Sequence, residues 1–315
     1  MMSPVFLCYL AFAGPFNLEV VKNIATENEN EDFYMNQPVD MAIQDGFLYI
    51  TDHHEHCVLK LSMEGEYLER IGRQGEGPGE FFRPLSLFAN RENLFVYDNT
   101  QKFQTLSPSG TYKSSFKTVE FINEFIVRKD RIYAIRINRI TGGYFSCLNL
   151  KGEEIFRKKL AFKSRYDHYY QDNFSRIHLI GQKIAVIQIY EPALHFFSED
   201  GDLIRTVKFE FSPFSDEAYL ETNYKFAFQD VVAIGNNWLT FYPAMGGLKW
   251  CLFSNDGKLL ERGVLALEPG TMGNLRAAEV RKTENGYRLY LLMLEPERNL
   301  LMVNANISAD AIHFE

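Results

Sequence analysis

The chain has 315 residues, of which 46% are hydrophobic and 15% aromatic, a composition that supplies a large buried core and excludes a mostly disordered protein. Its net charge of -8 repels a phosphate backbone, and its Lys and Arg residues are scattered singly, so no nucleic-acid partner is expected. Four cysteines without CxxC spacing, Cys8, Cys57, Cys147 and Cys251, are predicted to be free buried thiols.

Residues 1–13 are apolar and end in Ala11-Phe12-Ala13 before Gly14, which resembles the small-residue cleavage site of an export signal. The stretch has no preceding Lys or Arg and is too short to span a bilayer. Either a degenerate or truncated export signal or a frayed or packed N-terminal segment fits this pattern. We expect residues 14–315 to form one domain without a transmembrane segment.

A repeated unit begins with a polar residue that follows a short extended run and precedes a second apolar strand by eight residues. This spacing occurs six times along the chain. The stretches between carry turn residues such as Asp45-Gly46 and Asn285-Gly286, so each unit is predicted to start with a β-hairpin. The six polar residues are Asp40, Ser86, Glu124, Arg176, Asp230 and Glu279.

In five of the six units a third strand ends with Ser or Asn three residues before a glycine, which predicts a tight hairpin at positive φ. A fourth strand follows, for example Tyr67 to Ile71 and Leu203 to Phe209. Four antiparallel strands per unit make one propeller blade. The five pairs are Ser62 and Gly65, Ser107 and Gly110, Asn149 and Gly152, Ser198 and Gly201, and Ser254 and Gly257.

The sixth unit lacks the glycine, because none follows Asn304 before the sequence stops at Glu315. Residues Asn17 to Ile24 have the composition of a fourth strand and precede the first unit. The sequence therefore predicts an all-β, six-bladed β-propeller with four antiparallel strands per blade and the last blade closed by the N-terminal strand. This closure removes open sheet edges.

The first strand of each propeller blade lines the central channel, so the six recurring polar residues are predicted to form a ring at the channel mouth. Close carboxylates at Asp40, Glu124, Asp230 and Glu279 repel one another and require raised pKa values, the neighbouring Arg176, or a bound cation. Oxygen ligands of this kind suit Ca²⁺ or Mg²⁺. A water-filled polar channel, a ligand-binding mouth and a metal site remain open alternatives.

Two longer segments between blades are rich in aromatic and hydrogen-bonding groups, which a sugar or peptide ligand needs for stacking and orientation. These groups could equally pack down and cap the blades. The candidate ligand-binding residues in the two segments are Tyr166, His168, Tyr169, Tyr170, Tyr219 and Tyr224.

The most metal-like string is Asp52-His53-His54-Glu55-His56. It is predicted to form the turn between the second and third strands of the first blade, where an Asp and polar residues shape the turn. The adjacent rings of His53 and His54 cannot readily share a metal.

The segment from Ile71 to Phe81, IGRQGEGPGEF, followed by Phe82-Arg83-Pro84, resembles the inter-blade signature of NHL-repeat propellers. Residues 17 to 307 as a whole resemble the six-bladed, NHL-like propeller proteins common in Bacteroidetes, within the TolB-like six-bladed superfamily. The resemblance implies an exported, often lipid-anchored protein, periplasmic or associated with the cell surface, with no assigned activity.

Nucleophile motifs, phosphate-binding loops and His-Glu-x-x-His are absent from the sequence. The expected function is therefore non-catalytic binding of a glycan, peptide or envelope protein by a monomer that has no cofactor. The alternative is a metal-dependent hydrolase or lyase similar to the six-bladed lactonases, with Asp40, Glu124, Asp230 and Glu279 as ligands of Ca²⁺ or Mg²⁺. Ser86 and Arg176 depart from the lactonase ligand set.

Overall fold

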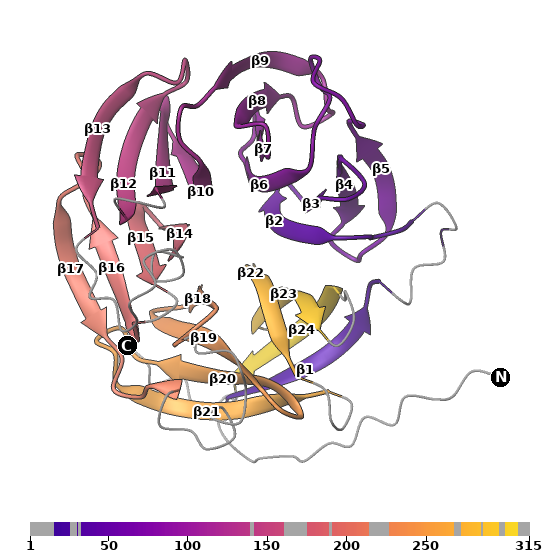
Figure 1. Ribbon diagram of the computed structural model, residues 1–315. Helices are drawn as coiled ribbons and strands as arrows, with labels where there is room; N and C mark the ends of the chain where they lie inside the picture. The colour runs from indigo at the N-terminus through magenta and orange to yellow at the C-terminus, as the bar shows by residue number, and fades with distance from the viewer. Residues whose placement is uncertain are drawn as a thin grey trace. The chain divides into compact units, whose positions relative to one another are not determined.

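The computed structural model describes residues 16–25, 30, 33–138, 142–160, 175–188, 191–213, 227–267, 272–284, 286–295 and 300–307. The strands within these ranges form four-stranded antiparallel sheets, six in all, each built from strands that follow one another with one exception. The fold is the predicted all-β, six-bladed propeller with four antiparallel strands per blade (Figure 1).

The chain divides into two compact parts, each described by itself. Residues 24–208 hold blades 1 to 4. Blade 1 comprises β2 (Pro38–Gln44), β3 (Phe47–Asp52), β4 (Cys57–Ser62) and β5 (Tyr67–Ile71); blade 2 comprises β6 (Pro84–Ala89), β7 (Leu94–Asp98), β8 (Lys102–Leu106) and β9 (Tyr112–Lys117); blade 3 comprises β10 (Ile122–Arg128), β11 (Arg131–Asn138), β12 (Gly142–Asn149) and β13 (Glu154–Lys159); blade 4 comprises β14 (Ser175–Ile180), β15 (Lys183–Gln188), β16 (Ala193–Phe197) and β17 (Leu203–Lys208).

The second part joins the residues up to 23 with residues 209–315 and holds blades 5 and 6. Blade 5 comprises β18 (Asp230–Ile234), β19 (Asn237–Ala244), β20 (Gly247–Phe253) and β21 (Leu259–Ala266); blade 6 comprises β22 (Asn274–Thr283), β23 (Gly286–Glu295), β24 (Leu300–Ile307) and β1 (Phe16–Asn23).

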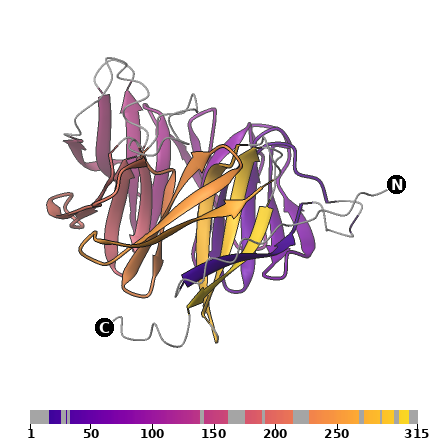
Figure 2. The ribbon, with the colours of Figure 1, turned by 90° about the horizontal axis from the view of Figure 1, so that it is seen from below.

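The N-terminal strand completes blade 6, as the sequence predicts, because β1 pairs antiparallel with β24 from Phe16 opposite Ile307 to Asn23 opposite Leu301. The strand begins and ends one residue earlier than expected. The Phe16 ring meets Trp250 of blade 5 edge to face at 5.3 Å between centroids. Figure 2 shows β1, in indigo, beside the yellow strands of the same blade.

The hairpin between the third and fourth strands confirms the Ser/Asn-x-x-Gly pattern. In blade 3, the N–H of Gly152 donates to the carbonyl of Asn149, and Asn149 Oδ1 accepts the N–H of Glu153. Gly152 has a φ of +85°, and a Cβ there would lie 2.3 Å from the Phe116 ring of blade 2. The glycine is therefore required both for its φ and for close packing between blades.

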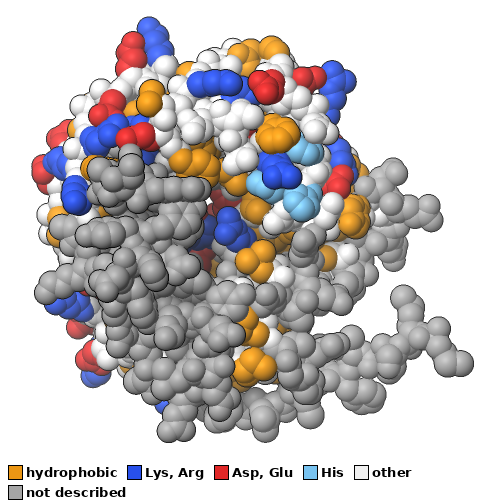
Figure 3. Space-filling model, viewed as in Figure 1, with side chains coloured by type: hydrophobic (Ala, Val, Ile, Leu, Met, Phe, Trp, Pro, Cys, Tyr) orange, Lys and Arg blue, Asp and Glu red, His pale blue; other side chains and the backbone are white. Residues whose placement is uncertain are grey.

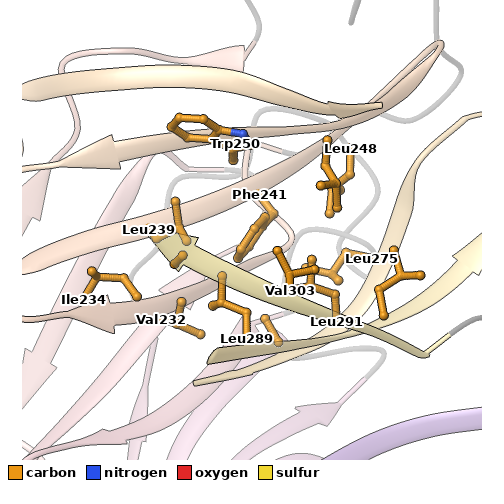
Figure 4. Close-up of a cluster of buried hydrophobic side chains, with 14 of the residues drawn as sticks. Val232, Ile234, Leu239, Phe241, Leu248, Trp250, Leu275, Leu289, Leu291 and Val303 are labelled. Atoms are coloured by element: carbon orange, nitrogen blue, oxygen red, sulfur yellow. The ribbon is translucent and has the colours of Figure 1, made fainter. Parts of the chain in front are cut away.

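Apolar side chains fill the space between neighbouring blades. In the part that holds blades 5 and 6, one cluster joins both sheets and includes Phe241, Leu289 and Val303, each 0% exposed (Figure 4). Burying such a side chain contributes about 1.5–3 kcal/mol. Separate clusters lie between blades 1 and 2, between blades 2 and 3, and between blades 3 and 4.

Three of the four predicted buried thiols lie in the described residues and are confirmed: Cys57, Cys147 and Cys251 are buried, and none of the three forms a disulfide. Burial raises the pKa of Cys57 to about 12 and that of Cys147 to about 11. Cys8 lies outside the described residues, as does the whole candidate export signal. No helix among the described residues has the length and apolar character needed to cross a bilayer.

Candidate functional site

Five of the six predicted channel-mouth residues lie at the start of a first strand. Asp40, Ser86 and Glu124 are the third residues of β2, β6 and β10. Arg176 is the second residue of β14, and Asp230 is the first residue of β18. The repeat spacing therefore locates these five positions correctly, and hydrogen bonding decides what each of them does.

Asp40 links blade 1 to blade 2. Its Oδ2 accepts the backbone N–H of Leu87 at 2.9 Å and the hydroxyl of Ser86 at 3.0 Å. Its Oδ1 accepts the N–H of Met41 at 3.0 Å. Because the side chain is buried, both oxygens serve as acceptors for the backbone and hydroxyl of two adjacent first strands.

Glu124 links blade 3 to blade 4 in the same way. Its Oε2 accepts the N–H of Ile177 at 2.9 Å, and its Oε1 forms an ion pair with the guanidinium of Arg176. The side chains of Glu124 and Arg176 are only 11% and 12% exposed. Arg176 therefore balances the charge of a carboxylate in this blade pair, which is one of the three solutions that the sequence left open.

Asp230 links blade 5 to blade 6. Its Oδ2 accepts the N–H of Ala278 at 2.8 Å, and its Oδ1 accepts the N–H of Val231 at 2.8 Å. The neighbouring Gln229 adds a second contact of this kind, since its Oε1 accepts the N–H of Leu275 at 3.0 Å. Asp40, Glu124 and Asp230 thus perform one task, and we call them the inter-blade carboxylates.

Glu279 departs from the predicted placement near a strand start, because it is the sixth residue of β22. In blades 2 and 4 the N–H that meets the inter-blade carboxylate comes from the residue after Ser86 and the residue after Arg176. In blade 6 it comes from the residue before Glu279. Compared with β6 and β14, the ten-residue β22 is therefore displaced by two residues along the preceding blade, and Glu279 lies nearer the β22–β23 hairpin.

The described residues contain no group of three or more His, Cys, Asp or Glu side chains arranged to hold a metal ion. For the inter-blade carboxylates the reason is visible in their contacts, because each uses both oxygens on backbone N–H groups or on a side-chain donor. Coordination of a cation at these oxygens would compete with those hydrogen bonds.

The string Asp52–His56 forms the turn between β3 and β4, as expected. Asp52 Oδ1 accepts the N–H groups of Gln37, His54 and Glu55 at 3.0, 3.2 and 3.1 Å, and its Oδ2 accepts that of Asn36 at 2.6 Å. The carboxylate therefore shapes the turn and joins it to the segment before β2, which supports the structural interpretation of this Asp.

The glycine-rich segment between β5 and β6, residues 72–81, is fixed to blade 2 by Lys102. Lys102 Nζ donates to the carbonyls of Glu76, Gly77 and Glu80 at 2.9, 3.1 and 3.0 Å. Burial lowers the pKa of Lys102. Gln104 contributes further, since its Oε1 accepts the N–H of Gly79 at 3.0 Å. The segment that resembles the NHL signature therefore forms a loop around the ammonium group of Lys102.

The aromatic candidates Tyr166, His168, Tyr169, Tyr170, Tyr219 and Tyr224 lie outside the described residues and stay predictions. Sequence reasoning named Phe82 and Arg83 only as part of the inter-blade signature and did not predict that they lie against the His53–His56 turn. The available signal was a cationic residue next to an aromatic one at the end of a glycine-rich loop.

Comparison with known proteins gives one family. A model described as "6-bladed beta-propeller" (DUF5128) matches residues 24–221, which is more than half of the chain. No curated protein sequence matches the chain.

Solved structures with the same fold share little sequence with this chain. A putative exported protein from Bacteroides fragilis has 12% identity and a TM-score of 0.61, with 93% of this chain and 96% of that chain covered. A member of the duf4221 family from Bacteroides vulgatus has 11% identity and a TM-score of 0.63, with coverages of 92% and 98%.

Virginiamycin B lyase from Staphylococcus aureus has 11% identity and a TM-score of 0.51, with coverages of 92% and 99%. At such identities the likeness concerns the fold alone. With the blade architecture and the family match together, the chain belongs to the DUF5128 family of 6-bladed beta-propellers.

Proposed function

We propose that this chain is a non-catalytic recognition propeller of the cell envelope that binds a glycan, peptide or envelope protein through the ends of the blades that carry the inter-blade loops. The proposal includes export of the protein, in keeping with the apolar residues 1–13 and the fold shared with a putative exported Bacteroides protein.

The observation that carries the proposal is the use made of the inter-blade carboxylates. Asp40, Glu124 and Asp230 are three of the four residues that a lactonase-type enzyme would need as metal ligands. Each accepts a backbone N–H from the next blade at 2.8–2.9 Å. These hydrogen bonds to the carboxylates stabilise the contact between neighbouring blades. We therefore assign ligand recognition to the surface loops.

The test is a binding screen of the purified protein against glycan and peptide arrays, with and without EDTA. Saturable binding of one ligand class that EDTA leaves unchanged is the expected result. An absence of saturable binding on both arrays would count against a recognition function for these two ligand classes and shift the search to envelope proteins, tested with purified candidates.

The enzymatic alternative has its own measurement. Calorimetric titration of Ca²⁺ and Mg²⁺ into chelator-treated protein should give no saturable heat if the carboxylates hold the backbone. Saturable binding that Asp230→Ala and Glu124→Ala both abolish would refute the non-catalytic interpretation and justify a screen for lactone hydrolysis.

A further inference from the structure

A cationic surface lies where the β3–β4 turn of blade 1 meets the end of the β5–β6 loop. We call it the His–Arg patch, and it consists of His53, His54, His56, Phe82 and Arg83. His54 and Arg83 are exposed, and the other three are half-buried. In the space-filling view, histidine side chains gather around a Lys or Arg side chain beside hydrophobic ones (Figure 3).

The backbone of the patch is held in place before any ligand arrives. The N–H of Arg83 donates to His56 Nδ1 at 3.0 Å, which joins the β3–β4 turn to the end of the β5–β6 loop. The N–H of Phe82 donates to Asp98 Oδ2 at 3.1 Å, and the carbonyls of Phe82 and Arg83 both lie within 3.2 Å of the N–H of Asn99. A binding surface that is fixed in advance loses less entropy on association.

Two residues of the patch adopt a left-handed backbone that side chains rarely take: His56 has a φ of +55° and Arg83 a φ of +54°. The glycine-rich segment just before Arg83 places glycine at its own positive-φ positions, Gly72, Gly75 and Gly79. Arg83 therefore carries a backbone cost that glycine would avoid, and such strain concentrates at ligand-binding positions.

Within the described part of the chain, the positive charge of Arg83 has no ion-pair partner, and its guanidinium lies over the Phe82 ring at 5.8 Å. The two carboxylates of the turn are engaged elsewhere, since Asp52 binds backbone N–H groups and Glu55 pairs with Arg70 at 3.1 Å. Burial lowers the pKa of His53, and the charges of Arg83, His54 and His56 lower it further.

We propose that the His–Arg patch binds the carboxylate of an acidic saccharide, with the anion on Arg83 and the exposed His54 and the sugar ring against Phe82. An anion without a sugar ring would not use the aromatic surface of Phe82, and a neutral sugar would not balance the charge of Arg83. This inference rests on the proposed function, because it names the ligand class of the loop-bearing end.

The test is calorimetric titration with three probes: trigalacturonate, the matching neutral galactose trisaccharide, and a tripeptide of glutamate. Trigalacturonate should bind best. Arg83→Gly suits the positive φ and should weaken its affinity roughly tenfold to a hundredfold, as expected for loss of a charge-assisted hydrogen bond. The matched control is Arg91→Gly, which removes another exposed arginine, whose guanidinium lies 3.8 Å from the carboxylate of Asp45, and should change affinity less than about twofold.

His54→Gln provides a second variant at an exposed position and should also weaken binding, so the proposal stays testable if Arg83→Gly folds poorly. Equal binding of the neutral trisaccharide, tighter binding of the peptide, an unchanged affinity in both variants, or no binding of trigalacturonate would each overturn the inference. A neutral or peptide ligand found on the arrays would leave the proposed function standing while this inference fails.

Discussion

The substitution Asp40→Asn separates a carboxylate that holds two blades together from one that binds a metal. Asp40 is 9% exposed, and its two oxygens accept the N–H groups of Leu87 and Met41 and the hydroxyl of Ser86. Asparagine keeps one acceptor and places an NH₂ group against the donors of the other side. One buried donor then loses its partner, which costs about 1–3 kcal/mol.

The assay is urea unfolding of wild type and variant, followed by far-ultraviolet circular dichroism, in EDTA and again with Ca²⁺ or Mg²⁺. We expect Asp40→Asn to lower the free energy of unfolding by the same amount in every buffer. The control is Asp45→Asn, since Asp45 is exposed at a turn with a φ of 49°, which asparagine tolerates, and should change stability by less than about 0.5 kcal/mol. A loss confined to the metal-containing buffers, or no loss at all, would refute the reasoning.

Three further predictions concern other contacts. Lys102→Met removes the ammonium inside the glycine-rich segment and should speed its amide hydrogen exchange, whereas the exposed Lys117→Met should not; equal protection in both would contradict the proposed role. The pKa of His53 is lowered in the folded protein, so below pH 6.5 the unfolded chain binds more protons and the wild type loses stability as the pH falls. His53→Asn should lose less stability than the wild type between pH 7 and pH 5, and an equal change of the urea midpoint in both proteins would disprove this. Gly152→Ala should cost about 1–3 kcal/mol more than Gly46→Ala in urea unfolding, since both have positive φ but only Gly152 faces a ring at 2.3 Å; equal losses would show that the ring moves freely.

The blade pattern could be predicted from the sequence because its determinants are local. A Ser or Asn side chain binds the N–H four residues later, and the glycine three residues later takes a positive φ, so the hairpin is encoded within five residues. The eight-residue spacing is likewise set inside one hairpin. Closure by the N-terminal strand followed by elimination, because blade 6 lacked a fourth strand of its own.

The roles of the polar residues could not be predicted, because they depend on the register between blades. Glu279 keeps the same spacing to its hairpin as the other five positions, yet β22 is displaced by two residues against Asp230. The spacing in a single sequence gives the distance along one hairpin and carries no information about the register of that hairpin against the next blade. The His–Arg patch escaped notice for a similar reason, since His56 and Arg83 are 27 residues apart and belong to different blades.

The pairing of β1 with β24 also has a kinetic consequence. Phe16 and Ile307 lie at opposite ends of the chain, so their contact has almost the largest sequence separation available. During synthesis, residues 24–208 supply all strands of blades 1 to 4 in order, and each hairpin can form as soon as it emerges. In blade 6, β1 stays unpaired until β24 has been synthesised. Their pairing then closes a loop that contains all the intervening residues, which is slow. We expect the last slow step of folding to be the docking of this N-terminal strand.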